Sequence, residues 1–174
     1  MPRCKNCKDK FEPIRFNHKF CLKDECVKAF VEETKAAAWK NTKKKWTTEL
    51  KTTTDWLKDA QKVFNTYIRQ RDEGKPCISC NQPINGVKHA SHYLSSGGHS
   101  NVRFHEDNVW VSCYKCNVML SGNQIEYRKR LIEKIGNDRV QWLEENGNQV
   151  KKWELDELKL LIKIYKKKTK EFNK

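Results

Sequence analysis

Apolar residues recur at helical spacing over residues 54–73, and this is the clearest element of the chain. Six of them form one stripe at positions i, i+4, i+7, i+8, i+11 and i+12, and these are Trp56, Ala60, Val63, Phe64, Tyr67 and Ile68. Thr54 suits the N-cap position, with Asp55 in the first turn, and Gly74-Lys75-Pro76 ends the helix. The stripe predicts a helix whose apolar face belongs to a core.

Three further segments of the C-terminal half carry helical patterns. The first starts at Asn123 and is closed by Gly136, a residue type that commonly ends helices. A shorter helix that includes Val140 is expected to end near Gly147. The last covers about residues 154–170, where the apolar positions are Leu155, Leu158, Leu161, Ile162 and Tyr165.

Residues 27–54 give a weaker signal. They contain no Gly or Pro and are rich in Lys and Thr. The segment is compatible with a helix or with a flexible basic linker. We predict a helix from about Cys26 onward that passes into a linker before residue 54.

Elements are short between residues 77 and 122. A knuckle is followed by a strand that ends near His92, a Ser-Ser-Gly-Gly turn, and a second knuckle that runs into a helix carrying Asn117. Two further pieces look extended, and these are Val102–His105 and Val109–Val111. Knuckle, hairpin, knuckle and helix around one zinc form the treble-clef arrangement, which needs its metal because so few residues bury little apolar surface. The predicted fold class is α+β, mainly α, with this zinc-stapled core flanked by helices.

Eight cysteines fall into four close pairs. The first pattern is CxxC, thirteen residues and CxxxxC, and the second is CxxC, 32 residues and CxxC. Such pairs present two thiolates from one turn and are typical of structural zinc. The expected ligands are Cys4, Cys7, Cys21 and Cys26 for one Zn²⁺ and Cys77, Cys80, Cys113 and Cys116 for the other. Each set fills a tetrahedral shell, so neither zinc would be open to chemistry.

These patterns predict four parts. Residues 1–30 form an N-terminal zinc module, 31–54 a basic helix or linker, 55–150 the central domain and 151–174 a basic C-terminal helix. No apolar run approaches the length of a membrane span, and the N-terminus does not begin like a signal peptide. We therefore expect a cytoplasmic protein whose cysteines bind metal and do not form disulfides.

Positive charge is concentrated at the two ends of the chain. Lys and Arg number 36 against 22 Asp and Glu, a net charge of +14, of which residues 1–54 carry +7 and residues 151–174 carry +5. This favours DNA as a partner, although a basic surface can also serve solubility alone. The candidate DNA contacts are Lys43, Lys44, Lys45, Arg103, Lys115, Arg128, Lys166, Lys167 and Lys168.

Four residues within or directly after the central cysteine frame carry candidate chemistry, and they are His89, His92, Asn108 and Asn117. Phosphodiester hydrolysis needs a base that activates water and a divalent cation that neutralises charge on the leaving oxygen. A neutral histidine suits the first role. A metal-binding side chain at the end of the strand, facing an asparagine at the start of the helix, suits the binding of the divalent cation. Asn108 is equally compatible with a plain turn residue.

Within the double CxxC frame, His92, Asn108 and Asn117 resemble the site of an HNH (ββα-metal) nuclease. A closer resemblance is carried by His92-Tyr93, Arg103-Phe104, Asn108, Cys113-x-x-Cys116-Asn117 and Ser121-Gly122-Asn123. This set resembles the NinG (Rap) family of lambdoid phage recombination proteins, over nearly the whole chain. The resemblance implies a metal-dependent, structure-specific endonuclease that acts on branched DNA such as Holliday junctions.

The resemblance also implies a role for each residue. His92 would be the general base, Asn117 a ligand of the catalytic Mg²⁺ or Mn²⁺, and Asn108 the residue that fixes the loop orienting the histidine. The family usually has Asp where this chain has His89, and that Asp would be the second ligand. An imidazole can still bind a metal, but it favours transition ions such as Mn²⁺ over Mg²⁺. At position 91 this chain has Ser where the family usually has Gly.

Two other functions are compatible with the sequence. A non-catalytic zinc protein that binds DNA would need the cysteines and the charge, but neither His92 nor Asn117. An HNH nuclease of the homing or restriction type would cut linear duplex at a specific sequence. A homodimer is reasonable because resolving a junction takes two cuts, and phage or host recombination proteins are further candidate partners.

Overall fold

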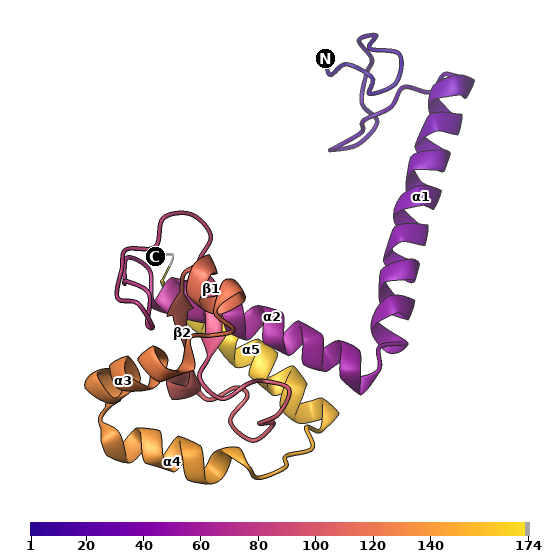
Figure 1. Cartoon of the computed structure of the whole chain (residues 1–174). Helices are drawn as coiled ribbons and strands as arrows, with labels where there is room; N and C mark the ends of the chain where they lie inside the picture. Colours follow the sequence, from indigo (N-terminus) through magenta and orange to yellow (C-terminus); the bar gives the residue numbers. More distant parts are fainter. Residues whose placement is uncertain (173–174) are drawn as a thin grey trace. The chain divides into compact units, whose positions relative to one another are not determined.

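The computed structural model describes residues 1–172, and the chain divides into two compact units between Lys51 and Thr52 (Figure 1). Helices dominate the described residues, and their one sheet has two strands. The prediction of a mainly helical α+β protein is therefore confirmed in this coarse form. The predicted C-terminal part, 151–174, extends two residues beyond the described chain.

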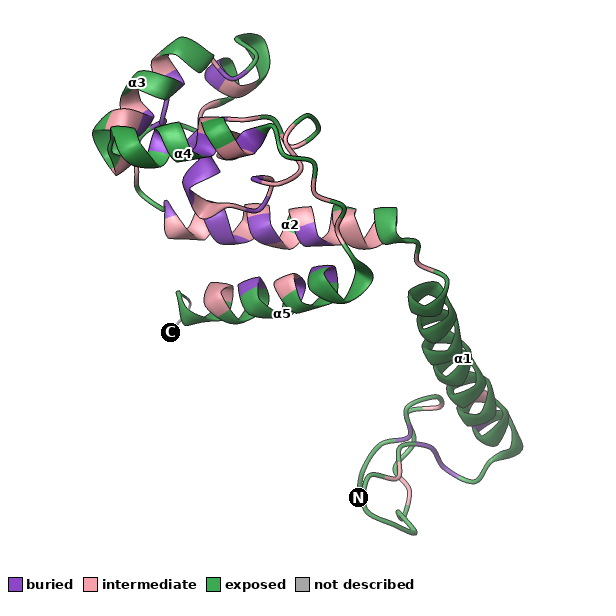
Figure 2. Ribbon diagram, turned by 90° about the horizontal axis from the view of Figure 1, so that it is seen from below, coloured by how far each residue is buried: buried purple, intermediate pink, exposed green. Residues whose placement is uncertain are grey.

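The first unit consists of a looped segment and one long helix. An isolated bridge between Arg3 and Lys10 closes the N-terminal loop, and α1 then runs from Asp24 to Glu49. Cys26 is its one buried residue. Figure 2 shows the rest of this helix almost entirely exposed.

The helix predicted from about Cys26 is present and leaves only residues 50–52 as a linker before α2, because α1 continues without a break through the lysine run. Lys, Ala and Glu are good helix formers, and no Gly or Pro interrupts them. The threonines do not interrupt it either. Thr42, Thr47 and Thr48 each donate their hydroxyl to the carbonyl four residues earlier, at 2.8–3.1 Å.

The second unit begins with α2, Thr53–Arg71, as the apolar stripe predicts. The N-cap is Thr52, and the expectation of Thr54 is wrong. Thr52 accepts a hydrogen bond from the backbone N–H of Asp55, and Asp55 accepts one from the backbone N–H of Thr52 at 3.1 Å. This reciprocal capping box satisfies two N–H groups, which a cap two residues later could not do with the same carboxylate.

The sheet pairs β1, His89–His92, with β2, Val109–Ser112, in antiparallel register. His89 lies opposite Ser112, and His92 opposite Val109. A 3₁₀ turn, η1, at Glu106–Asn108 leads into β2. The strand predicted to end near His92 and the extended piece at Val109–Val111 are both confirmed.

Three helices complete the second unit: α3, Gln124–Ile135; α4, Asn137–Gly147; and α5, Leu155–Glu171. All three lie within a few residues of their predicted positions. One core joins α2 to α5 and includes Phe64, Ile68 and Leu158. A second core lies under α3 and α4 and includes Tyr127 and Leu143 (Figure 2). The small sheet lies between the two, with Ala90 against the first core and Trp110 against the second.

Two expectations for the central segment are wrong in detail. Residues 101–104 form a turn, closed by the backbone N–H of His105 donating to the carbonyl of Val102 at 3.1 Å, and are not extended. Asn117 lies in η2, a five-residue π-helical turn at Lys115–Met119, and not in a longer helix. Positive φ angles at Ser121, Gly122 and Asn123 reverse the chain before α3 begins.

Candidate metal centres and active site

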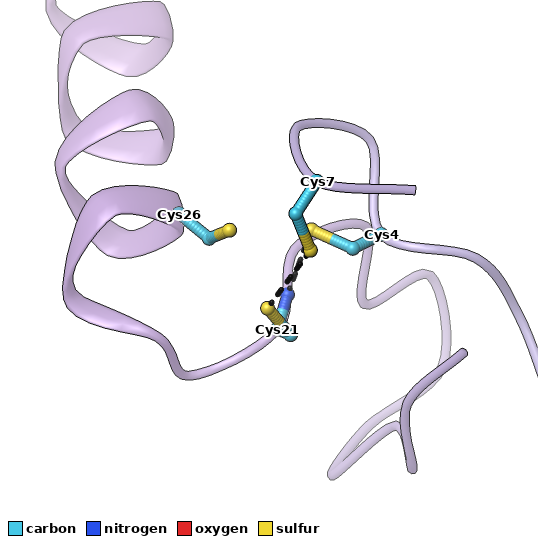
Figure 3. A group of neighbouring side chains, drawn as sticks. All are labelled: Cys4, Cys7, Cys21 and Cys26. Atoms are coloured by element: carbon cyan, nitrogen blue, oxygen red, sulfur yellow. Dashed lines mark hydrogen bonds between the residues drawn. The ribbon is translucent and has the colours of Figure 1, made fainter. Parts of the chain in front are cut away.

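The N-terminal cysteines converge on one point, as Figure 3 shows. Their sulfur atoms lie within 4.8 Å of one another, and the Sγ atoms of Cys7 and Cys21 are 3.7 Å apart. Cys26 comes from the first turn of α1, so the cluster ties the loop to the helix. The side chain of Asn6 donates to the Sγ of Cys26 at 3.5 Å. The four residues predicted to share an ion are therefore brought together.

The central set converges in the same way. Cys77, Cys80, Cys113 and Cys116 also lie within 4.8 Å of one another, with 3.9 Å between the sulfurs of Cys80 and Cys113. The side chain of Asn123 lies 3.8 Å from the Sγ of Cys116. The cluster joins the segment after α2 to the η2 turn, and thus holds the sheet region between two helical elements.

Both sets fit a tetrahedral zinc ion. With Zn–S bonds of about 2.3 Å, a tetrahedron has S–S edges of about 3.8 Å, and the S–S distances of 3.7 and 3.9 Å agree with this. Burial, together with the neighbouring thiols of Cys113 and Cys80, raises the pKa of the Cys116 thiol to about 12. Four thiolates at such a point need a cation. The two clusters could therefore each hold zinc through four sulfurs, with no position left for water.

His92 is a neutral imidazole held at the end of β1. Its Nε2 lies 3.1 Å from the backbone carbonyl of Arg103. Because a carbonyl oxygen only accepts, Nε2 carries the proton and Nδ1 is the ring's acceptor. Burial lowers the pKa of His92 to about 4, so the imidazole is neutral at neutral pH. Within residues 1–172, Nδ1 has no hydrogen-bond partner.

The carbonyl that holds His92 is itself fixed by α2. The Nε of Arg103 donates to the Oε1 of Gln61 at 2.8 Å. Phe104, the next residue, packs its ring against that of Phe64 with centroids 5.6 Å apart. α2 thereby fixes the position of the segment whose carbonyl group accepts the hydrogen bond of His92.

Asn108 is fully buried and clamps the loop that follows His92. Its Oδ1 accepts from the backbone N–H of Leu94 at 2.8 Å, and its Nδ2 donates to the carbonyls of Leu94 and Val102, each at 3.0 Å. Three backbone groups from the two ends of the loop thus converge on one amide. A plain turn residue bonds only its own neighbours, so this geometry is that of a loop-fixing residue.

We expect Asn108→Ala to lower the free energy of unfolding by about 2–4 kcal/mol, because three backbone groups lose their hydrogen-bond partner inside the protein. Urea denaturation measures this. Asn148→Ala, a change at an exposed residue, is the matched control and should cost less than about 0.5 kcal/mol. A loss at Asn108 no larger than that of the control would contradict the clamp.

His89 differs from His92 in its surroundings. Its Nε2 is buried and has no hydrogen-bond partner in the described chain, and the same holds for the Oγ of Ser112, its cross-strand partner. Its ring lies 5.9 Å from that of Tyr114, at the start of the η2 turn that carries Asn117. Two buried polar atoms without a partner on one face of a sheet are unusual in a folded protein and make this face a candidate for further polar contacts.

The two histidines do not share a face of the strand. They are three residues apart in a regularly paired strand, so their side chains project from opposite faces. His92 lies on the face of Ala90, toward α2, and His89 on the face of Trp110, toward α3. The side chain of Asn117 makes no hydrogen bond within residues 1–172.

Comparison with known proteins identifies the family. A family profile described as "Bacteriophage Lambda NinG protein" matches residues 1–174. This chain belongs to the NinG family. Protein ninG of Escherichia phage lambda is 37% identical over 122 residues, which is 70% of this chain and 59% of the relative's length. Protein ninG of Escherichia phage 933W is 31% identical over 186 aligned positions, 97% of this chain and 92% of the relative.

The NinG membership confirms the family resemblance inferred from the sequence and is consistent with a role in phage recombination. Protein ninG of Salmonella phage P22 is a further relative, 36% identical over 122 residues, with 70% of this chain and 60% of the relative covered. No solved structure matches the chain. In the described residues of this NinG-family chain, no helix is long and apolar enough to span a membrane.

The basic residues predicted to contact DNA differ in whether they form ion pairs in this NinG-family chain. Arg128 is held by Glu144 through two hydrogen bonds, at 2.7 and 3.1 Å. Lys168 pairs with Glu106 at 2.5 Å. Lys45 lies 3.9 Å from Glu49. Those that form no ion pair among the described residues are Lys43, Lys44, Arg103, Lys115, Lys166 and Lys167.

Sequence reasoning missed one group of cations in the NinG-family chain. Arg71, Lys75 and Lys134 lie 4.1, 5.6 and 4.7 Å from the centre of the Trp110 ring. Buried Asp72 accepts hydrogen bonds from Arg71 and Lys75, while Lys134 forms no ion pair within the described residues. No spacing in the sequence signals this group, because it joins α2, β2 and α3.

Proposed function

We propose that this NinG-family protein is a metal-dependent DNA endonuclease that acts on branched recombination intermediates. The observation that carries the proposal is the state of His92. Its Nε2 is committed to the Arg103 carbonyl at 3.1 Å, its Nδ1 remains an acceptor, and its pKa of about 4 keeps it neutral. A positioned neutral imidazole with a free ring nitrogen can accept a proton from water.

The chain's own residues support this chemistry in a definite order. Asn108 and Arg103 hold the segments around His92, so that the ring needs no reorganisation when it takes a proton from water at Nδ1. The cysteine clusters provide the frame and take no part in proton transfer. A divalent ion would supply charge neutralisation at the scissile phosphate.

Asn117 and His89 are the proposed residues for that ion. An unpartnered, buried Nε2 on His89 and an amide of Asn117 without a hydrogen bond in the described chain suit a nitrogen-and-oxygen site. His89 projects from the face of β1 opposite to His92. Asn117 follows the zinc ligand Cys116 directly, so the cluster fixes its backbone.

Branched DNA is proposed as the substrate from the family resemblance and from the charge. Basic residues without ion pairs lie in both compact units, in α1 and in α5. Lysines spread in this way suit contact with phosphates along more than one stretch of backbone.

A panel of substrates and metals tests the proposal. The purified protein is incubated with a labelled four-way junction, a fork and a linear duplex of the same sequence, each without added metal and with Mg²⁺ or Mn²⁺. We expect nicks in the junction or the fork, dependent on metal, and at least tenfold less cutting of the duplex. Tight, salt-sensitive binding with no cleavage under any metal would instead select the non-catalytic DNA-binding function. Sequence-specific cutting of the duplex would select the homing or restriction type.

His89→Asp should shift the metal preference. A carboxylate suits Mg²⁺, whereas imidazole favours transition ions, so we expect the ratio of Mg²⁺-supported to Mn²⁺-supported cleavage to rise about tenfold. His105→Asp, at another histidine of the same unit, is the control and should leave the ratio unchanged. An unchanged ratio in His89→Asp would remove His89 from the metal site.

A further inference from the structure

α1 exposes two tryptophans on one face. Trp39 and Trp46 are 59% and 51% exposed, and neither belongs to a hydrophobic cluster of the described residues. They are seven residues apart, which is two helical turns, so they lie on the same side of the helix. Their rings meet edge to face, with centroids 5.7 Å apart. In this arrangement the partner ring covers neither face of the ring that contributes its edge.

A lysine lies between the two tryptophans in sequence and shares their side of α1. Lys43 is four residues after Trp39 and three before Trp46, so it belongs to the same face. Lys43 forms no ion pair in the described chain, and the same is true of Lys40 and Lys44. The half of α1 from residue 37 to 49 carries four lysines against one glutamate. This half of α1 is thus strongly positive.

Aromatic rings combined with cations form the usual platform for unpaired nucleotides. Bases stack on the ring faces, and lysines contact the phosphates between them. Paired bases inside a duplex are already stacked on one another and cannot stack on the indoles. A duplex can therefore bind such a surface only through contacts between its phosphates and the lysines. Large exposed indoles would add nothing to duplex binding beyond what lysines supply.

We propose that the Trp39–Lys43–Trp46 face of α1 binds unpaired nucleotides of DNA. This inference rests on the proposed function, which makes DNA the ligand. It deepens that function because branch points and forks expose unstacked bases that the face could bind. The charge of the face favours nucleic acid over a second copy of the same helix, since matching positive halves would repel one another.

The test measures binding, and not cleavage, with the full-length protein in buffer without added divalent metal. A fluorescein-labelled oligo-dT strand and a hairpin duplex of equal phosphate count are the probes, followed by anisotropy. We expect the double variant Trp39→Ala/Trp46→Ala to lose about tenfold or more in affinity for oligo-dT and less than threefold for the hairpin. The Trp39→Phe/Trp46→Phe variant should retain most of the single-strand affinity, because phenyl rings still stack.

Two further variants, and the oligomeric state of the double alanine variant, complete the design. Lys43→Ala should weaken both probes and reduce the salt slope by about one. Trp142→Ala removes a tryptophan that is 45% exposed on α4 and should leave oligo-dT binding within twofold. Equal losses on both probes in the double alanine variant would overturn the proposal. A dimer that becomes a monomer in that variant, with oligo-dT binding unchanged, would also overturn it and assign the face to a second copy. Because these measurements follow binding and not cleavage, they test the tryptophan face even if the protein proves not to be a nuclease.

Discussion

Removal of zinc is expected to unfold residues 1–23 completely while much of the second unit persists. The buried cluster of the first unit consists of Cys4, Cys21, Cys26 and a single aromatic residue, Phe20. Without metal this cluster has almost no apolar surface to bury, and structural zinc contributes on the order of 10 kcal/mol to such modules. The second unit has two apolar cores of its own, which do not consist of cysteines.

Elemental analysis and segment-resolved hydrogen exchange measure this effect. The intact protein should hold about two zinc ions per chain, by four thiolates per ion. Cys4→Ser should reduce this to about one and remove protection from residues 1–23 only. Cys116→Ser should also lose one zinc, and it should expose the η2 turn and the β1–β2 pair while α2 and α5 stay protected. Full zinc content in either variant, or protection of residues 1–23 after chelation, would contradict the assignment.

The second large effect is expected at His92. His92→Ala should lower the rate of junction cleavage by a factor of about 10² to 10⁴, the usual contribution of a general base. DNA affinity should stay within twofold, since the ring is partly buried and does not add charge at neutral pH. His18→Ala, at a histidine of the first unit, is the control and should leave the rate within twofold. Zinc content and thermal unfolding of both variants distinguish lost chemistry from lost fold.

The pH dependence of cleavage follows from the lowered pKa of His92. An ordinary histidine would give an inflection near pH 6.5. Burial lowers this pKa to about 4, so the base form is already complete above about pH 5, and no inflection near 6.5 is expected. The same shift affects stability, because the unfolded state binds a proton that the folded state rejects. The contribution of His92 is present above about pH 6.5 and is lost as the pH falls toward 4.

The helices of the second unit were predictable because their apolar stripes are long and regular. α2 was placed from six apolar positions, and Gly136 marked the end of α3 because a positive φ of 86° is needed there. The N-cap of α2 was not predictable from Thr54 alone, since three threonines stand in a row and only the reach of Asp55 selects Thr52.

Short elements were harder to predict, because tertiary contacts determine them. Val102 and Phe104 look like alternating strand residues, yet one packs in each core, and the chain turns between them. The two cysteine sets could be predicted without knowledge of tertiary contacts, because the close spacing within each pair already places two thiols on one turn. The opposite directions of His89 and His92 follow from a spacing of three residues in a strand, once the strand is accepted. The cations around Trp110 come from α2, the segment after it and α3, and could not be found from spacing.

The most direct test of the nuclease proposal is single-turnover cleavage of a labelled four-way junction with Mn²⁺ by the wild-type protein and by His92→Ala. Both are used at concentrations where anisotropy shows equal occupancy of the junction. We predict metal-dependent nicks by the wild-type protein and a rate at least 100-fold lower for the variant. Equal rates for the two proteins, or no cleavage by the fully zinc-loaded wild-type protein, would contradict the role assigned to His92.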